Sequence, residues 1–134
     1  MECGGECSIR DIVSRYFEYI NNRKFDELFG LFCEDVIFSC PVDFRVKGLE
    51  KIKPFYLKVP ENYPQHADMP LDVLIQGNRA AVLIQFEGKS AAGVPVSFLA
   101  TDWFTFEGGK IKTLTIFFDS LGLSRSLKGT ERGD

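Results

Sequence analysis

The stretch most informative about the fold is IVSRYFEYINNRKFDELFGLFCEDVIFSCPVDFRVKGLEKIKPFY, residues 12–56. In its first part, apolar residues recur at the spacing of one face of an α-helix. This pattern predicts a helix that is capped by Ser8 and stops at Asn21. A second, shorter apolar segment begins near Phe25, so two helices are expected to open the fold.

A strand and a third helix follow in the same stretch. Apolar and polar residues alternate over 35–40, which predicts a strand that Pro41 ends. Apolar positions after Gly48 predict another helix. Pro54 lies inside it and should shorten or bend it, because proline lacks the backbone donor that a helix interior uses.

The second half of the chain has the pattern of an antiparallel meander. Prolines border a predicted loop over 57–69. Strands are then predicted over 70–76, 79–88, 94–107 and 111–119, with glycine-containing turns between them. Helices followed by a meander predict the α+β class. We expect one domain over 9–120, with a flexible tail over 1–8 and a C-terminal tail over 121–134.

Composition limits the functional classes. The chain has 134 residues, 45% of them hydrophobic, which suits one domain with a real core. Thirteen phenylalanines predict an apolar interior and favour an apolar pocket. The net charge of −3 favours neither nucleic acid nor an anionic membrane as a partner. No run of 18 apolar residues and no secretory pattern is present, so we expect no membrane span and a cytoplasmic location.

Four cysteines invite a search for metal or disulfide chemistry. Cys3 and Cys7 flank a Gly-Gly pair, and the sole histidine, His66, lies far along the chain. This spacing lacks the ligands of a zinc site, so an exposed terminus with no metal or cofactor is expected.

Two polar residues fall on otherwise apolar faces. Tyr16 lies in the apolar stripe of the first helix, where its hydroxyl needs a partner; a core tyrosine bonded to backbone is the alternative. Asp102 shares strand parity with Phe98 and Phe104. Burial there would raise the pKa of its carboxyl, which could then donate a hydrogen bond to a ligand oxygen. The alternative is an acid at the wet edge of the strand, paired with a lysine or arginine.

Three further residues could take part in proton transfer, and a fourth, His66, could lie near a pocket. Cys40 ends the predicted strand and is either a small buried hydrophobe or a functional thiol. Asp43 is a possible base in the following loop. Asp119 ends the last strand and points away from a cavity unless a bulge reverses it. His66 is expected to be exposed in its loop, although it could cover the mouth of a pocket.

Three motifs carry a resemblance to a known family. They are VSRYFEYINNRKFDELFGLFCEDV, GLEKIKPFY and ATDWFTFEGGKI. The chain resembles the nuclear-transport-factor-2-like superfamily, in its branch of ketosteroid isomerases and SnoaL-like polyketide cyclases, over about residues 9–120. The resemblance implies a conical, cystatin-like cup, in which a curved antiparallel sheet packs on three N-terminal helices. It also implies a homodimer formed through the open sheet face.

The same resemblance suggests roles for individual residues. Tyr16 resembles the oxyanion-hole tyrosine of the isomerases, Tyr56 its hydrogen-bonding partner, and Asp102 the neutral acid that gives the second oxyanion bond. The base of the isomerases is replaced by Cys40, whose thiol is mostly protonated at neutral pH. Ala100 stands where related epoxide hydrolases have arginine, which argues against that chemistry.

Two functions therefore compete at the level of sequence. The first is an isomerase- or cyclase-type enzyme for a small apolar carbonyl compound, in which Tyr16 and Asp102 stabilise an enolate and Cys40, Asp43 or Asp119 moves the proton. The second is a non-catalytic small-molecule-binding or protein-interaction module. In either case the predicted ligand-binding residues are Tyr56, Phe38, Phe55, Phe98, Phe104, Leu114, Ile116 and Phe118.

Overall fold

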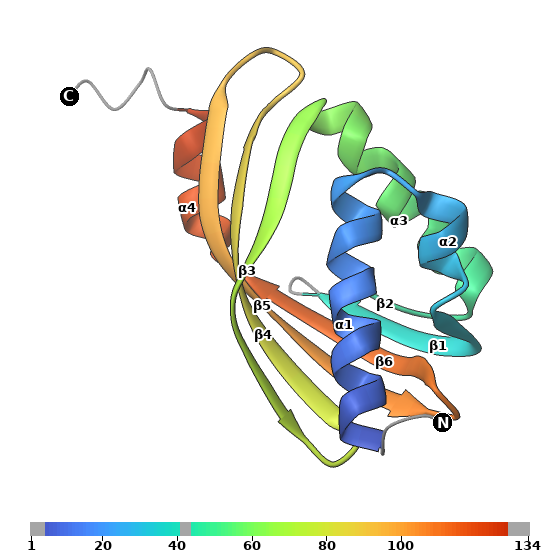
Figure 1. The fold of residues 1–134 in the computed structure, drawn as a ribbon. Coiled ribbons are helices and arrows are strands. Elements are labelled where there is room, and N and C mark those ends of the chain that lie inside the picture. The colour runs from blue at the N-terminus through green and yellow to red at the C-terminus, as the bar shows by residue number, and fades with distance from the viewer. Residues whose placement is uncertain (1–4, 41–43, 129–134) are drawn as a thin grey trace.

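Four helices and six strands make up the structure, a computed structural model that describes residues 5–40 and 44–128 (Figure 1). In chain order they are α1 (Gly5–Asn21), α2 (Phe25–Phe29), β1 (Phe32–Cys40), β2 (Phe44–Lys47), α3 (Leu49–Asn62), β3 (Gln65–Gln76), β4 (Arg79–Lys89), β5 (Pro95–Glu107), β6 (Lys110–Phe118) and α4 (Ser120–Leu127). The predicted α+β class is confirmed. The sequence pattern did not predict β2 or α4.

The strands form one curved, open sheet in the order β2-β1-β6-β5-β4-β3. Helices α1, α2 and α3 lie together on one side of it, so the molecule is a cup (Figure 1). The predicted curved sheet is confirmed, and its strands pair antiparallel except β1 and β6, which run parallel. Parallel neighbours need a long crossover, and here α3 and four strands (β2, β3, β4 and β5) supply it.

The core forms where the apolar stripe of α1 meets the inner face of the sheet. Phe32, Phe38, Phe104 and Leu114 are fully buried there, together with Tyr16 from the helix. Each such side chain contributes roughly 1.5–3 kcal/mol by leaving water. The helical pattern that predicts α1 thus corresponds to a real buried face, although α1 begins at Gly5, so Ser8 is not its cap.

Helix α3 is longer than predicted and includes both Pro54 and Pro60. Pro54 removes a hydrogen bond to the carbonyl of Glu50, but Glu50 is exposed, so water can satisfy that carbonyl. Burial of Ile52 and Tyr56 on the opposite face holds the helix in place. The predicted loop over 57–69 is therefore the end of α3 and the start of β3.

Strand β3 contains a bulge that matters for the site. Its register against β4 shifts between Pro70 and Asp72, where Leu71 is one extra residue. Because side chains alternate between the two faces of a strand, an extra residue reverses which positions face inward. After the bulge, the odd-numbered residues Val73 and Ile75 face inward and pack against the core. Before the bulge, the even-numbered residues face inward instead.

The end of the chain also differs from the prediction. Residues 120–127 form α4 beside β5 instead of a tail, and Asp119 caps this helix by accepting a 2.8 Å hydrogen bond from the backbone N–H of Gly122. The remaining parts of both predicted tails, 1–4 and 129–134, lie outside the described residues. Within the described ranges, no helix has the length and apolar character needed to cross a membrane.

Candidate functional site

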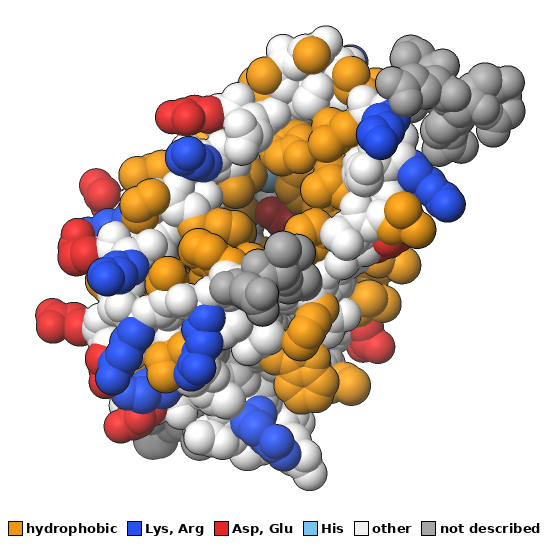
Figure 2. Space-filling view, turned by 180° about the vertical axis from the view of Figure 1, so that it is seen from behind, with side chains coloured by type: hydrophobic (Ala, Val, Ile, Leu, Met, Phe, Trp, Pro, Cys, Tyr) orange, Lys and Arg blue, Asp and Glu red, His pale blue; other side chains and the backbone are white. Residues whose placement is uncertain are grey.

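A cavity of about 330 Å³ opens between α1, α3 and the sheet. Figure 2 shows it as a hollow lined mainly by hydrophobic side chains, with acidic and histidine atoms visible inside. Its polar or charged lining residues are Tyr16, Tyr56, Lys58, Asn62, Tyr63, His66, Asp68 and Asp102. An apolar hollow with a few converging polar groups is the usual form of a small-molecule site.

Two tyrosines form a hydrogen-bonded pair in the wall of the cavity. The hydroxyl oxygens of Tyr16 and Tyr56 are 2.6 Å apart, and both side chains are buried. Burial raises the pKa of each hydroxyl well above its ordinary value, so both keep their protons at neutral pH. One proton lies between the two oxygens, and the other can be donated to a ligand.

Asp102 reaches the same cavity from β5. It lies between Val82 of β4 and Ile116 of β6 in the sheet and is only 4% exposed. No group among the described residues hydrogen-bonds to its carboxyl. Every side-chain oxygen that is completely buried in the described residues has a hydrogen-bond partner, so the unpartnered oxygens of Asp102 are not completely buried and face the cavity. Burial raises the pKa of Asp102 well above its ordinary value, and the charge of Asp68 adds to the shift.

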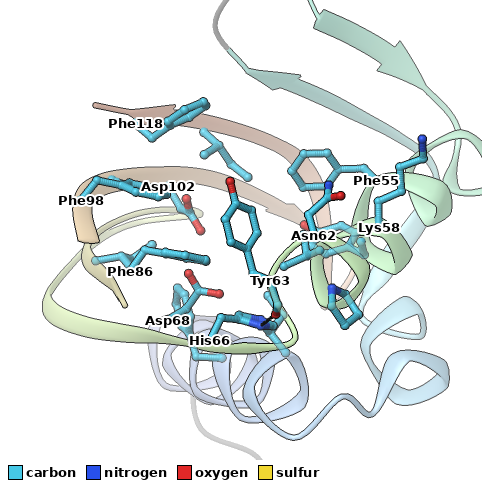
Figure 3. Close-up of a pocket in the computed structure, with 18 of the residues that line it drawn as sticks. Phe55, Lys58, Asn62, Tyr63, His66, Asp68, Phe86, Phe98, Asp102 and Phe118 are labelled. Atoms are coloured by element: carbon cyan, nitrogen blue, oxygen red, sulfur yellow. Dashed lines mark hydrogen bonds between the residues drawn. The ribbon is translucent and has the colours of Figure 1, made fainter. Parts of the chain in front are cut away.

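Asp68 is a second acid in the cavity, and the β3 bulge explains its position. The bulge turns Asp68 inward, opposite Phe86 of β4. The side chain of Asn21, at the end of α1, accepts a hydrogen bond from the Asp68 backbone N–H at 2.8 Å and donates one to its carbonyl at 2.9 Å. Burial raises the pKa of the Asp68 carboxyl to about 6. In Figure 3 both carboxyl groups point into the same space.

His66 lies on β3 beside Asp68 and also faces inward, so the expectation of an exposed loop histidine is wrong. Its ring stacks on Phe86 at 5.6 Å between centroids. Its Nδ1 is 3.1 Å from the carbonyl oxygen of Tyr63, which can only accept, so Nδ1 carries the proton and Nε2 is an acceptor. Burial lowers the pKa of this imidazole, which keeps it neutral. Gly88 lies opposite His66, and a side chain there would collide with the backbone of β3.

The structure brings some of the predicted site residues together and leaves others out. Those that line the cavity are Tyr16, Tyr56, Asp102, Phe55, Phe98, Ile116 and Phe118. Phe38, Phe104 and Leu114 do not line it and instead belong to the solid core, each at most 1% exposed. They share the inward parity of the cavity residues but lie under the helices, where packed side chains cover them.

Two of the three predicted bases, Cys40 and Asp119, do not line the cavity. Cys40 is half-buried at the end of β1 and does not line the cavity, and burial raises the pKa of its thiol, so it is a poor base. Asp119 serves as the cap of α4. Asp43 lies outside the described residues. The acids and histidine of the described ranges form no cluster of three that could hold a metal ion.

Comparisons with known proteins agree with this architecture. Residues 13–114 match the model of the SnoaL-like domain family. A nuclear-transport-factor-2-like protein of unknown function from Burkholderia pseudomallei is 18% identical, with a TM-score of 0.81 over 88% of this chain and 95% of its own. A candidate SnoaL-like polyketide cyclase from Jannaschia sp. CCS1 is 18% identical, with a TM-score of 0.82 over 94% and 95%.

A third solved structure contains a ligand. The protein TerC, co-crystallised with polyporic acid, is 18% identical, with a TM-score of 0.81 over 90% of this chain and 98% of its own. No curated protein sequence matches the chain. The likeness to these structures shows that the fold is that of nuclear-transport-factor-2-like proteins. Because the family model spans most of the sequence, the chain belongs to the SnoaL-like domain family.

Proposed function

We propose that the protein is an enzyme that acts on a small apolar compound with a carbonyl group and stabilises an enolate-like oxyanion through Tyr16 and Asp102. The observation that carries this proposal is a carboxyl with a strongly raised pKa in the same apolar cavity as a hydrogen-bonded tyrosine pair. A protonated carboxyl is a donor, so both groups offer an O–H to one oxygen. Donors fixed in an apolar site are the largest single source of catalysis in many enzymes.

The size of the cavity limits the ligand. A cavity of about 330 Å³ lies at the lower end of the range of about 300–1,000 Å³ that is usual for small-molecule sites. Its aromatic walls favour flat rings. Polyporic acid, found with the related fold of TerC, is a quinone with phenyl substituents and has this general chemistry. We therefore propose a ring compound with one conjugated or enolisable carbonyl.

One observation favours the alternative, a non-catalytic binding module. Neither Cys40 nor Asp119 lines the cavity, so within the described residues these two predicted bases are unable to reach a ligand. In such a module Tyr16 and Asp102 would fix the polar end of the ligand without proton transfer. The two functions share the same oxygen-binding end and differ in whether any group removes a proton.

Binding of 2-naphthol, a flat analogue of an enol, tests the oxygen-binding end. Tyr16→Phe and Asp102→Leu are each expected to weaken binding about 10-fold to 100-fold, because each removes a hydrogen bond that strengthens as the oxygen gains charge. Naphthol fluorescence, which changes on ionisation, reports both affinity and protonation. Tyr19→Phe is the matched control, since Tyr19 lies on α1 but outside the cavity. Unchanged affinity in both cavity variants would reject the proposed oxyanion site.

We also propose that the protein forms a homodimer through the outer face of the sheet. Leu74, Leu83, Leu99, Trp103 and Phe117 are all exposed, between 39% and 66%, on the face opposite the cavity. Their neighbours Thr101 and Thr115 carry no charge, whereas Asp72 lies opposite Leu83 at the β3 side of the patch. A two-fold interface joins a patch to its own copy, and the apolar residues of β5 and β6 meet their copies without charge repulsion.

A charge in this face tests the dimer. Trp103→Glu is expected to shift the protein from dimer to monomer at micromolar concentration, because two like charges would meet in an apolar interface. Sedimentation velocity measures the masses. Leu57→Glu is the control, since Leu57 is equally exposed on α3, away from the sheet. A wild-type protein that sediments as a monomer at 50 to 100 µM, on the order of weak dimer affinities, would refute the proposal.

A further inference from the structure

We infer that Asp68 is the base of this site, the group that takes a proton from the substrate carbon and returns it. This inference builds on the proposed function, since it needs a ligand oxygen held by Tyr16 and Asp102. It adds a residue on β3 that neither the sequence pattern nor the family match assigns. It would also remove the strongest reason for regarding the protein as a binding module.

The first argument is the placement of Asp68 relative to the oxyanion donors. Asp68 pairs with Phe86 and Asp102 with Val82, positions four residues apart on β4 and on strands either side of it. In a flat sheet this would separate them by roughly 13 Å along the strand. The curved sheet turns both side chains into one hollow, where their carboxyl groups face a common space (Figure 3). A ring whose oxygen lies at Asp102 and Tyr16 therefore presents its carbons toward Asp68.

The second argument is that the carboxyl is free while its backbone is fixed. Asn21 holds the Asp68 main chain with two hydrogen bonds. No donor among the described residues binds the Asp68 side chain, so its oxygens are available to a ligand. A base must be positioned within hydrogen-bond reach yet uncommitted, and this arrangement meets both conditions.

The third argument is the protonation of the two acids. The pKa of Asp68 is about 6, whereas burial raises the pKa of Asp102 well above its ordinary value, so near neutral pH the first is a carboxylate and the second a neutral acid. Two acids whose environments separate their pKa values mark the base and the acid of a site. The charge of Asp68 adds to the rise in the pKa of Asp102, so the two acids titrate as a coupled pair.

The other titratable groups in the cavity are consistent with this assignment. They are His66 on the same strand, Tyr16 on α1, Tyr56 and Lys58 on α3, and Tyr63 directly after it. The tyrosines at 16 and 56 stay protonated. His66 is neutral, and its ring is held by Phe86 and the Tyr63 carbonyl. Its free Nε2 makes it the one competitor for the role of base among the described lining residues.

The proton balance of the reaction is simple. The Asp68 carboxylate takes the proton next to the carbonyl, so a C–H bond breaks and an O–H bond forms on Asp68. The electron pair moves onto the ligand oxygen, where Tyr16 and Asp102 hydrogen-bond to it. Asp68 then returns the proton to the same carbon or to a conjugated one. No oxidant or co-reactant is needed.

Exchange of the acidic protons of 2-tetralone in D₂O, followed by ¹H NMR, tests the base directly. Wild type should exchange faster than buffer, with a rate that rises with pH through about 6 and then levels off, because only ionised Asp68 accepts a proton. Asp68→Asn should lower the rate about 10²-fold to 10⁴-fold while 2-naphthol still binds. Asp72→Asn, on the outer side of the same strand, should leave the rate unchanged.

Two further measurements make the outcome decisive. Carboxyl NMR titration should show that Asp68→Asn lowers the pKa of Asp102, because the charge of Asp68 contributes to its raised value. Proton exchange at the wild-type rate in Asp68→Asn would overturn the inference. If exchange were then lost in His66→Gln, His66 would be the base. Naphthol binding that depends on Tyr16 and Asp102 without any exchange in wild type would also overturn it, leaving a binding module. If 2-naphthol binds equally well after substitution of Tyr16 and after substitution of Asp102, the proposed function is refuted instead.

Discussion

Asp68→Asn is expected to raise the free energy of unfolding by about 2–3 kcal/mol at pH 8 and to leave it nearly unchanged at pH 3.5. The pKa of Asp68 is about 6 in the folded protein, above the value of about 3.9 for an unfolded aspartate. The folded state therefore holds this proton more tightly than the unfolded state. The stabilisation is full below about pH 4 and is lost as pH rises through 6, where a charge must be kept in an apolar cavity.

Urea unfolding at the two pH values measures this effect. Asparagine has nearly the same shape and no charge, so it removes the unfavourable ionisation above pH 6 without changing the packing. Asp72→Asn is the control, because Asp72 is exposed on the same strand and should change stability little at either pH. An equal difference between Asp68→Asn and wild type at both pH values would mean that Asp68 ionises in the folded protein as it does in water. Stabilisation with loss of proton exchange is the trade-off expected of a catalytic group.

Phe104→Ala is expected to lower the free energy of unfolding by about 3–5 kcal/mol, the usual range for removing a buried phenylalanine side chain. Phe104 is 1% exposed, and its ring meets the ring of Tyr16 edge-on at 5.1 Å and stacks on Phe106 at 5.8 Å. The substitution leaves a void directly behind Tyr16. Weaker 2-naphthol binding should accompany the loss of stability, because the Tyr16 hydroxyl is then less firmly placed.

Chemical unfolding of Phe104→Ala and Phe104→Leu separates the cavity from the loss of the ring. Leucine fills much of the volume and should recover a good part of the stability. Leu121→Ala is the control, since Leu121 is 59% exposed on α4. A loss below about 1 kcal/mol for Phe104→Ala would show that the site collapses around the void and that Phe104 does not support Tyr16.

Most of the fold could be predicted because its elements have strong periodic patterns. The helical stripe around Tyr16 and the alternation in 94–107 predict α1 and β5 well. The parallel pairing of β1 with β6 is a long-range contact that no local pattern contains. Helix α3 was predicted too short because Pro54 breaks a local rule that tertiary burial overrides.

The site was predictable only in part, for a physical reason. Tyr16 and Asp102 stand out because each interrupts an apolar face whose parity is regular. Asp68 and His66 lie in a segment bordered by prolines, which has the composition of a loop. Even if β3 is extended backward from Val73, alternation would place both on the outer face. Only the extra residue at Leu71 turns them inward, and a bulge has no reliable sequence signature.

The bulge at Leu71 makes the chemistry of this cavity depend on strand register as well as on residue type. If Leu71 took a place in the ladder and β3 alternated regularly backward from Val73, Ala67 and Met69 would replace His66 and Asp68 inside the cup. An acidic, proton-accepting hollow would then become an apolar one, and the displaced ionisable groups would lie on the solvent side. Deletion of Leu71 would instead join two segments whose registers already agree, so His66 and Asp68 would stay inside. Whether this cup holds ionisable or apolar groups at β3 thus depends on one residue standing outside the ladder.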